Sequence, residues 1–581
     1  MSQKVLISKE GLRKALGLKG LPGKWVASLL YGVLGIGKLN KVYPHVADLQ
    51  GPDFSEEVLR RFGISYEVPE GQLENIPSEG GFLNVSNHPF GGADGLILNA
   101  IVNPRRKDFK ILTTFLLAQV DNLTKWFIPV DNFSKGGVRS ITGIREALNH
   151  INTGGALGLF PTGEVSTYQK KDRRTAVSGK RVIEDKPWPE NITKLIKNSG
   201  LPVIPIYFDG TNSRLFHILG KIHPRLRTVR LVRELTCKEG TLVKVRIGKA
   251  IPASEIAEMN IPELGEYLRN RCYALEYQCL PDVEDEVEEM ISPLAEPVGQ
   301  DLVRAQIESL AGKELFQSGD YKAYLLDTSD APDVMRELYR LREESLRPVG
   351  EGCVKPVGTD PYDSCYKHLV LWNVPDGEIA GACRFGYGSK ILPSKGREGL
   401  YSSSLVRLGP GADEILSRCV EIGRFFVAPA YHEDVLPLRL LLSGLAVAAT
   451  KDPGTLYLTG MVGVGDSLPD FCKSLVYYYL ERGFKLPEAE NVATPANPFK
   501  PDYLRVDPKG LLKGIPEGDA DAFDRLISSI SGGKCRLPAH LREYLKCGAR
   551  VVCFNVAPLS GDRLEAMMVL KTSGIPTPLP V

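Results

Sequence analysis

A histidine and an aspartate lie close together on a glycine-containing stretch near the start of the chain. The stretch Asn87 to Gly95 reads NHPFGGADG and follows a short apolar run that is typical of a β-strand. An imidazole takes a proton from a hydroxyl near neutral pH, and a nearby carboxylate holds its tautomer and stabilises the imidazolium. His88 and Asp94 therefore predict a general base with its orienting acid, acting on the hydroxyl of a substrate.

A second group of charged residues lies in the C-terminal half. It comprises Arg342, Asp360, Asp363, Arg384, Glu421 and Arg424. A carboxylate in such a group can take a proton from a substrate, and we expect Glu421 to be this base. Two guanidinium groups, those of Arg384 and Arg424, suit either a bidentate grip on a substrate carboxylate or internal support of the site. The two aspartates are suited either to binding the ammonium group of an amino acid or to holding a loop in place.

The elements that must position these residues alternate between strand-like and helical patterns. In the first half, apolar runs at GGFLNVSNHP, KILTTFLLAQV, ALGLFPTGE and LPVIPIYFDG predict strands, with a helix over Val138–His150 between them. In the second half, strands are expected at YKAYLLD, HLVLWNV, IAGACRF, VEIGRFFVAP and TLYLTGMVGVG. Helices are expected over Ala331–Arg347 and at PLRLLLSGLAVAAT. The fold class is therefore α/β in both halves.

The length of 581 residues calls for more than one domain. Six acids between Asp282 and Glu289, without an apolar pattern, indicate a linker. We predict a basic and apolar N-terminal segment over 1–60, a first enzyme domain over 61–280, an acidic linker over 281–300 and a second domain over 301–581.

Further motifs surround the first pair. They are Phe127-Ile128-Pro129-Val130, Phe160-Pro161-Thr162-Gly163-Glu164 and Ile204–Ser213. In this order, with the His88 block, they resemble the four blocks of the glycerophospholipid acyltransferase family over residues 70–260, and especially its hemolysin-like, ornithine-lipid O-acyltransferase branch. The resemblance implies His88 as general base, Asp94 as its orienter, and Phe160, Pro161, Thr162, Gly163 and Glu164 as an acceptor-binding or oxyanion element.

Two departures from the family pattern stand out. Five residues rather than four separate His88 from Asp94, and we expect Gly91 and Gly92 to absorb the extra residue through permissive backbone angles. Thr162 replaces the glutamate that precedes the glycine of the third block, and an acid follows as Glu164. That glutamate helps to bind the acceptor's polar head in the family, so glycerol phosphate is a less certain acceptor here.

The second group resembles the acyl-homoserine-lactone synthase and ornithine N-acyltransferase branch of the GNAT-like fold over residues 320–575. These enzymes carry an early arginine, a D-x-x-D turn, a central arginine and an E-x-x-R-F block, which correspond here to Arg342, Asp360 to Asp363, Arg384 and Glu421 to Phe425. The resemblance implies transfer of an acyl chain from a carrier-protein thioester to the α-amine of an amino acid. It also implies that TGMVGVGDS lies where the strands part to admit a pantetheine arm.

Composition limits the partners of the protein. The 72 Lys and Arg against 70 Asp and Glu argue against a nucleic-acid binder, and the 11 Cys show no disulfide framework or metal-ligand spacing. We expect a cytoplasmic protein without a metal. The lysine-rich first 41 residues flank an apolar run at Trp25–Gly37, which predicts a peripheral contact with the inner membrane or a helix packed on its own domain. A basic stretch over Lys170–Lys186 predicts either a surface that binds acyl carrier protein or an anionic lipid, or a loop that is only solvated.

Two unlike acyltransferase halves resemble the bifunctional ornithine-lipid synthase architecture. The implied pathway places a 3-hydroxyacyl group from acyl carrier protein on the α-amine of an amino acid, ornithine being favoured, and then acylates the 3-hydroxyl of this lyso-lipid. No cofactor is expected beyond the acyl-carrier-protein thioester. The alternatives are a 1-acylglycerol-3-phosphate acyltransferase fused to an independent N-acyl amino acid synthase, and a non-catalytic scaffold that binds carrier protein or membrane.

Overall fold

The computed structural model describes most of the chain. It covers residues 35–114, 120–130, 138–169, 182–222, 224–279, 292–348, 351–353, 355–465, 468–501, 505–557 and 563–574, with isolated positions before residue 35. The chain divides into two compact units. Unit 1 comprises residues 1–281, 503–515 and 528–534, and unit 2 comprises the remainder. Two short segments from late in the sequence therefore fold with the N-terminal part.

Unit 1 is built on a seven-stranded sheet whose strands are short and mostly buried. In spatial order the strands are β1 (Ile64–Glu67), β9 (Thr241–Ile247), β8 (Val203–Phe208), β2 (Phe82–Ser86), β5 (Ala156–Leu159), β3 (Lys110–Thr114) and β4 (Phe127–Val130). Strand β2 is central and runs parallel to both β5 and β8. All five residues of β2 are buried, which shows that both faces of this strand are covered, and its two polar residues, Asn84 and Ser86, bond to each other. A separate hairpin pairs β6 (Thr167–Gln169) with β7 (Val182–Glu184).

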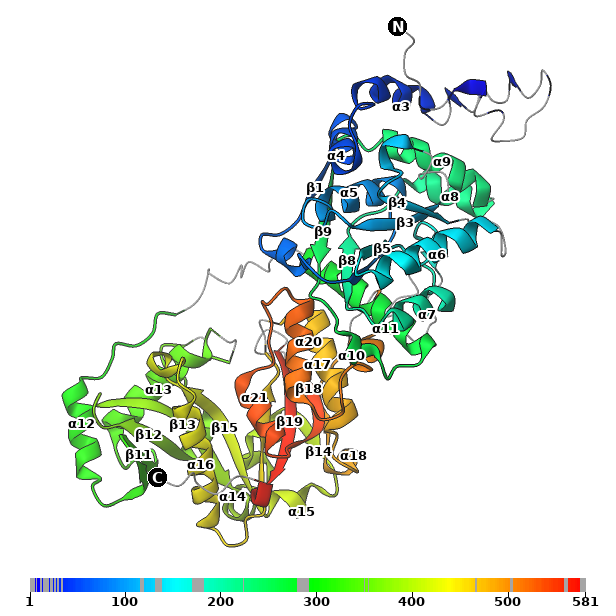
Figure 1. Ribbon diagram of the computed structural model, residues 1–581. Helices are drawn as coiled ribbons and strands as arrows, with labels where there is room; N and C mark the ends of the chain where they lie inside the picture. The colour runs from blue at the N-terminus through cyan, green and yellow to red at the C-terminus, as the bar shows by residue number, and fades with distance from the viewer. Residues whose placement is uncertain are drawn as a thin grey trace. The chain divides into compact units, whose positions relative to one another are not determined.

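Helices flank this sheet (Figure 1). They are α3 (Ile36–Val42), α4 (Gly51–Arg61), α5 (Gly92–Val102), α6 (Val138–Asn152), α7 (Glu190–Ser199), α8 (Arg214–Ile222), α9 (Pro224–Thr236), α10 (Ala253–Ile256), α11 (Ile261–Tyr273) and, from late in the chain, α19 (Pro508–Leu512). Helix α5 contacts both α4 and α9, whereas α7 contacts α6 and α11. The core reaches back to α4, since Phe54 and Val58 are buried in it.

Unit 2 contains an eight-stranded sheet. In spatial order the strands are β10 (Glu314–Ser318), β11 (Tyr321–Leu326), β12 (Lys367–Asn373), β13 (Glu378–Tyr387), β15 (Cys419–Val427), β16 (Tyr457–Gly463), β19 (Arg563–Lys571) and β18 (Arg550–Ala557). All neighbouring strands are antiparallel except β15 and β16, which are parallel. A small second ladder joins β14 (Val406–Leu408) to β17 (Ala493–Pro495).

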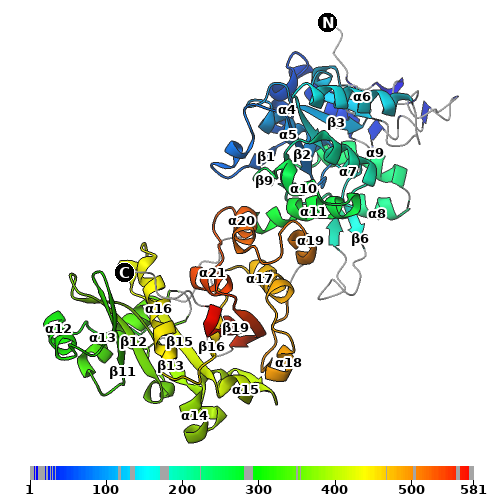
Figure 2. The same ribbon diagram turned by 60° about the horizontal axis from the view of Figure 1, so that its bottom comes forward.

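Helices cover both faces of the unit 2 sheet. They are α12 (Gln300–Ser309), α13 (Pro332–Leu346), α14 (Gly388–Lys395), α15 (Ala412–Leu416), α16 (Leu436–Thr450), α17 (Asp470–Gly483), α18 (Ala489–Val492), α20 (Ala520–Ile530) and α21 (Ala539–Lys546). Helix α13 packs against Val370 of β12 in one cluster, whereas Gly444 of α16 faces Leu369 of the same strand. Since neighbouring strand residues point to opposite faces, the two helices lie on opposite sides. Figure 2 shows α16 beside the strands.

The expected strands and helices of both halves are present, and the two α/β domains are confirmed. Two predicted features lie outside the described residues: the acidic run over 282–289 and the basic stretch from Lys170 to Arg181. The apolar run Trp25–Gly37 is described only in part, with six of its 13 residues outside the described part of the chain. Within the part of the chain that is described, no helix has the length and apolar character required to cross a bilayer.

Candidate active sites

The first candidate site lies at the carboxyl end of β2. The side chain of Asn87 pairs with the backbone of Phe208 in both directions, at 2.9 Å to its carbonyl and 2.8 Å from its N–H, which ties the loop to β8. The next residue, His88, places Nδ1 2.9 Å from Oδ2 of Asp94. The carboxylate is fully buried, and the histidine side chain is 16% exposed. Because Nδ1 faces the acid, Nε2 is the nitrogen that is left for a substrate hydroxyl.

Asp94 lies in the first turn of α5. Its Oδ2 also accepts the backbone N–H groups of Phe90 and Gly91, each at 2.9 Å. These two bonds fix the position of the carboxylate at the start of the helix. The extra residue between the histidine and the acid is absorbed at Gly91, whose φ is 88°, whereas Gly92 lies inside the helix without a positive φ. The predicted pair is therefore brought together in the geometry of a base and its orienting acid.

The turn after β5 forms one wall of this site. The ring of Phe160 stacks on His88 with centroids 4.2 Å apart. Thr162 Oγ1 donates to the carbonyl of Glu164 at 2.7 Å and so closes the turn, in which Gly163 has a φ of 59°. Burial alone would raise the pKa of Glu164, but bonds and charges from Lys186 and Arg227 outweigh burial and lower it.

Asp185 is a buried part of this site that the sequence did not reveal. Its Oδ1 accepts the hydroxyl of Ser166 at 2.6 Å and the backbone N–H of His88 at 3.3 Å. Burial raises the pKa of Asp185, partly offset by the bond from Ser166 and the charge of Arg269. The acid joins the hairpin segment to the histidine loop, and no motif marked it because its partners come from three separate segments.

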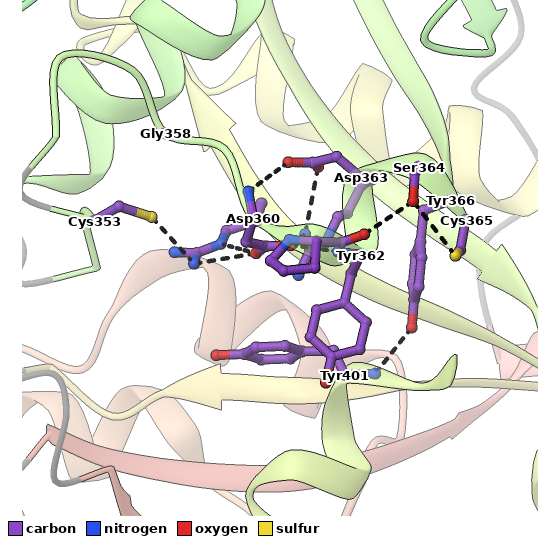
Figure 3. A network of polar contacts seen from close by, with 12 residues as sticks. Cys353, Gly358, Asp360, Tyr362, Asp363, Ser364, Cys365, Tyr366 and Tyr401 are labelled. Carbon is purple, nitrogen blue, oxygen red and sulfur yellow. Dashed lines mark hydrogen bonds and ion pairs between the residues drawn. The ribbon is translucent and has the colours of Figure 1, made fainter. Parts of the chain in front are cut away.

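The second candidate site centres on Glu421 in β15. Its buried carboxylate accepts the hydroxyl of Tyr366 and the backbone N–H groups of Tyr401 and Ser402, the latter two at 2.8 Å and 2.9 Å. Burial and the neighbouring carboxylate raise the pKa of Tyr366 far above its ordinary value, so this phenol stays protonated and donates. Figure 3 shows Tyr366 beside Tyr401 of η8 (Tyr401–Ser404).

Glu421 also marks the place where two parallel strands stop pairing. Strands β15 and β16 share a ladder over Cys419–Glu421 and Tyr457–Thr459, with no further paired position. The carboxylate is thus at the last paired residue, next to the glycine-containing end of β16. The last two residues of TGMVGVGDS, Asp466 and Ser467, lie outside the described residues.

The remaining predicted residues form one ion-pair network. Arg342 lies 2.9 Å from Asp363, Arg384 pairs with both aspartates, and Arg424 lies 3.3 Å from Asp360. Burial would raise the pKa of Asp363, but the charges of Arg342 and Arg384 outweigh it and keep the pKa low. The guanidinium groups therefore support the site internally, and three cations share two acids.

Arg384 lies at the centre of this network. It is fully buried, and the rings of Tyr362, Tyr366 and Tyr401 lie 5.3 to 5.6 Å from its guanidinium carbon. Its Nε and Nη2 have no hydrogen-bond partner among the described residues. Buried donors of this kind are expensive to leave unpaired, which makes them suitable for binding an anionic substrate group.

Two features around the network were not foreseen. Arg424 has a φ of 52° at a bulge between β13 and β15, a left-handed conformation that L-residues adopt at a cost and that is typical of functional sites. Its guanidinium contacts the sulfur of Cys353 at 3.4 Å (Figure 3). His368 is also buried, and burial together with the charge of Arg342 lowers its pKa to about 4. The neutral imidazole then accepts from Arg342 at Nδ1, 3.2 Å away.

Comparison with known families and proteins agrees with this division. Residues 12–280 match a family model described as Acyltransferase, and residues 341–442 match one described as Acetyltransferase (GNAT) domain.

Curated relatives are distant. A glycine N(alpha)-acyltransferase of Bacteroides thetaiotaomicron is 27% identical over 217 residues, which is 36% of this chain and 64% of that protein. A lyso-glycine lipid O-acyltransferase of the same organism is 26% identical over 261 residues, which is 43% of this chain and 90% of that protein. The chain thus spans less than two thirds of the length of the first of these relatives.

Among solved structures, the crystal structure of the 1-acyl-sn-glycerophosphate (LPA) acyltransferase from Thermotoga maritima is 14% identical, with a TM-score of 0.24, over 43% of this chain and 92% of that one. A CoA-dependent acyl-homoserine lactone synthase is 17% identical, with a TM-score of 0.18, over 26% of this chain and 76% of that one. On the evidence of the family models, the chain joins two acyltransferase domains, one described as Acyltransferase and one as Acetyltransferase (GNAT).

Proposed function

We propose that the protein makes an aminolipid by two successive acyl transfers, the first at nitrogen in unit 2 and the second at oxygen in unit 1. The observation that carries the proposal is the presence, in one chain, of two different acyltransferase domains that each hold a candidate base. The relatives that act on glycine and on a lyso-glycine lipid support the same order of reactions.

In the first reaction, Glu421 takes a proton from the α-ammonium of the amino acid, directly or through a water. The free amine attacks the carbonyl of a 3-hydroxyacyl thioester, an amide bond forms, and the carrier thiol leaves. The network of three arginines and two aspartates carries one surplus positive charge, which the α-carboxylate of the substrate would balance. The unpaired donors of Arg384 favour the same placement.

In the second reaction, Nε2 of His88 takes the proton of the 3-hydroxyl of the lyso-lipid. The hydroxyl oxygen attacks a second thioester, an ester bond forms, and the thiol again leaves. Asp94 stabilises the imidazolium that forms, and the 160–164 turn lines the acceptor side. We keep acyl carrier protein as the donor and a peripheral inner-membrane contact as parts of this proposal.

We favour glycine as the amine substrate. Ornithine follows from the resemblance of the motifs, but both relatives named above carry glycine in their names. The geometry supports the smaller substrate, because Asp360 and Asp363 are already paired with arginines and are not left for the second ammonium of ornithine. Mass spectrometry of polar lipids from a host that expresses the chain reads the headgroup mass directly.

Two single substitutions test the proposal in that host. His88→Ala is expected to stop synthesis at the monoacyl lyso-lipid, and Glu421→Ala to abolish the N-acyl product while supplied lyso-lipid is still O-acylated. His45→Ala and Glu378→Ala, which change residues outside both sites, serve as controls. Diacyl product from His88→Ala would refute the role of the histidine. If His88→Ala instead loses diacylglycerol phosphate and leaves all N-acyl products unchanged, the fused lysophosphatidate acyltransferase is correct.

A further inference from the structure

We propose that Glu164, Lys186 and Arg227 form a subsite in unit 1 that binds the headgroup carboxylate of the lyso-lipid. This inference rests on the proposed function and assigns residues to its acceptor. The three side chains form one cluster, since Glu164 Oε2 lies 2.8 Å from Nζ of Lys186 and 3.0 Å from Nη2 of Arg227. We call them the headgroup cluster.

The cluster is held beside the candidate base by the acidic residue at its centre. Glu164 lies between Phe160, whose ring stacks on His88, and Ser166, whose N–H donates to the carbonyl of His88 at 2.9 Å. The closed turn at Thr162 fixes the backbone of the same segment. The carboxylate of Glu164 is 44% exposed, so the cluster is open to a ligand on the side away from the core.

The two cations reach this point from different elements. Lys186 follows Asp185, the buried acid that bonds to the backbone of His88. Arg227 lies one helical turn before Leu231 on α9, and Leu231 approaches the histidine loop, since a Cβ placed on Gly91 would lie 2.9 Å from it. The missing side chain of Gly220 on α8 makes room for the arginine, whose Cδ lies 3.0 Å from where that Cβ would be.

Charge indicates the class of ligand. The headgroup cluster holds two cations and one acid, and the cations keep the pKa of Glu164 low despite its partial burial. One positive charge is therefore in surplus, which a single carboxylate balances. A phosphate monoester carries close to two negative charges at neutral pH and would leave the cluster negative. The cluster thus suits an N-acylated amino acid better than lysophosphatidate.

The chemistry of the acceptor fits this placement. In an N-(3-hydroxyacyl)glycine the hydroxyl oxygen and the carboxylate carbon are separated by six bonds, as many as span two backbone residues, which reach about 7 Å when extended. A ligand of that length whose hydroxyl lies at Nε2 of His88 keeps its carboxylate close to the histidine. The segment that carries Glu164 contacts the same histidine on both sides, through Phe160 and Ser166. Arginine binds such a carboxylate through two parallel hydrogen bonds.

The test uses the purified full-length protein, acyl carrier protein loaded with palmitate as donor, and three acceptors: N-(3-hydroxypalmitoyl)glycine, its methyl ester and 1-acylglycerol 3-phosphate. Arg227→Gln is expected to raise KM for the free acid about tenfold or more, with little change in kcat. The methyl ester, which lacks the charge, should be turned over equally by both proteins, and this activity also shows that the variant is folded. Gly220→Ala, which would press on the side chain of Arg227, should also raise KM for the free acid, but by a smaller factor.

A reciprocal variant sharpens the charge argument. Glu164→Gln makes the headgroup cluster doubly positive and should improve kcat/KM for 1-acylglycerol 3-phosphate relative to the free acid. Lys110→Gln removes a lysine of the same unit that pairs with Glu146, and serves as the matched control. Equal losses on acid and ester in Arg227→Gln, or no change on either, would overturn the subsite. Failure of the wild-type protein to acylate any of the three acceptors would instead refute the proposed function.

Discussion

The candidate bases of the two units differ in how they are held. In unit 1 a partly exposed histidine lies on a loop, and the buried acid Asp94 faces its ring. In unit 2 the carboxylate of Glu421 is inside a strand and accepts three hydrogen bonds, and a network of arginines and aspartates surrounds the site. The first arrangement sets one candidate base against one acid, whereas the second surrounds its candidate base with many charges.

Because of this difference, substitutions in the two units should differ in their effects on reaction rate and on stability. The pair in unit 1 can lose its acid with little loss of folding, because the loop has independent supports in Asn87 and Asp185. The buried charges of unit 2 compensate one another, and removing one leaves another unpaired in a medium of low polarity. We therefore expect substitutions in unit 1 to affect rate and those in unit 2 to affect stability as well.

Asp94→Asn should give the largest effect on rate. The amide keeps the shape but cannot stabilise the imidazolium, and by comparison with the acid of a Ser-His-Asp triad we expect kcat for O-acylation to fall about 10³- to 10⁴-fold. The melting temperature of unit 1 should hardly change in this variant. Asp108→Asn, which alters an acid paired with Arg106 in the same unit, should retain activity. A fall of less than tenfold would show that the acid does not assist the histidine.

Arg384→Met should give the largest effect on stability. It leaves Asp360 without its closest cation in a buried site, and loss of one partner of a buried pair costs about 3 to 5 kcal/mol. Arg397→Met breaks an exposed pair with Asp413 and should cost less than about 1 kcal/mol. Hydrogen exchange of peptides from β12 and β13, measured in the full chain, gives the loss of stability in each variant. Equal losses would mean that the network is not a buried, coupled unit.

Much of this contrast could be predicted from the sequence. The order of charged residues in the second half indicated a single group, and all of its arginines and aspartates meet in one network. The loop glycines were expected to adopt permissive backbone angles, and Gly91, with a φ of 88°, does so, whereas Gly92 does not. These features are local, or are carried by residue types whose chemistry demands partners.

The remainder depends on contacts between distant segments. Tyr366 and His368 lie close together at the start of β12. Tyr366 meets Glu421 because the sheet brings β15 near, and His368 meets Arg342 because helix α13 packs on the sheet. Asp185 reaches His88 from a position 97 residues away. Residues 505–515 fold with unit 1 although most of the surrounding sequence belongs to unit 2, and no periodicity indicates such an exchange.

His368 provides a test of the distributed arrangement by pH. Its pKa is lowered to about 4 from the ordinary 6.5, so the native state favours the neutral ring. The stability that this ring contributes is complete above pH 6.5 and is lost as the pH falls toward 4, which amounts to roughly 3 kcal/mol. His368→Asn keeps an acceptor for Arg342 and should flatten the fall in unfolding free energy of unit 2 between pH 6.5 and 4.5. The control His432→Asn changes an exposed histidine and should leave the pH dependence of the unfolding free energy as it is in the wild-type protein. Identical slopes in the wild-type protein and both variants would refute the role of His368.

Gly91→Ala is the mildest of these tests and examines whether the unit 1 loop must keep its shape. The residue has a φ of 88°, and an added Cβ would lie 2.9 Å from Leu231 and 3.2 Å from Val165, so both backbone and packing resist it. Gly80→Ala shares the positive φ but meets no atom within 4 Å, which isolates the backbone cost of about 1 kcal/mol. We expect Gly91→Ala to cost about 2 kcal/mol and to lower O-acylation about tenfold, since a small displacement of His88 relative to Asp94 impairs proton transfer. If both variants retain full O-acylation, the alignment of the pair does not depend on this turn, and the extra residue between them is merely tolerated.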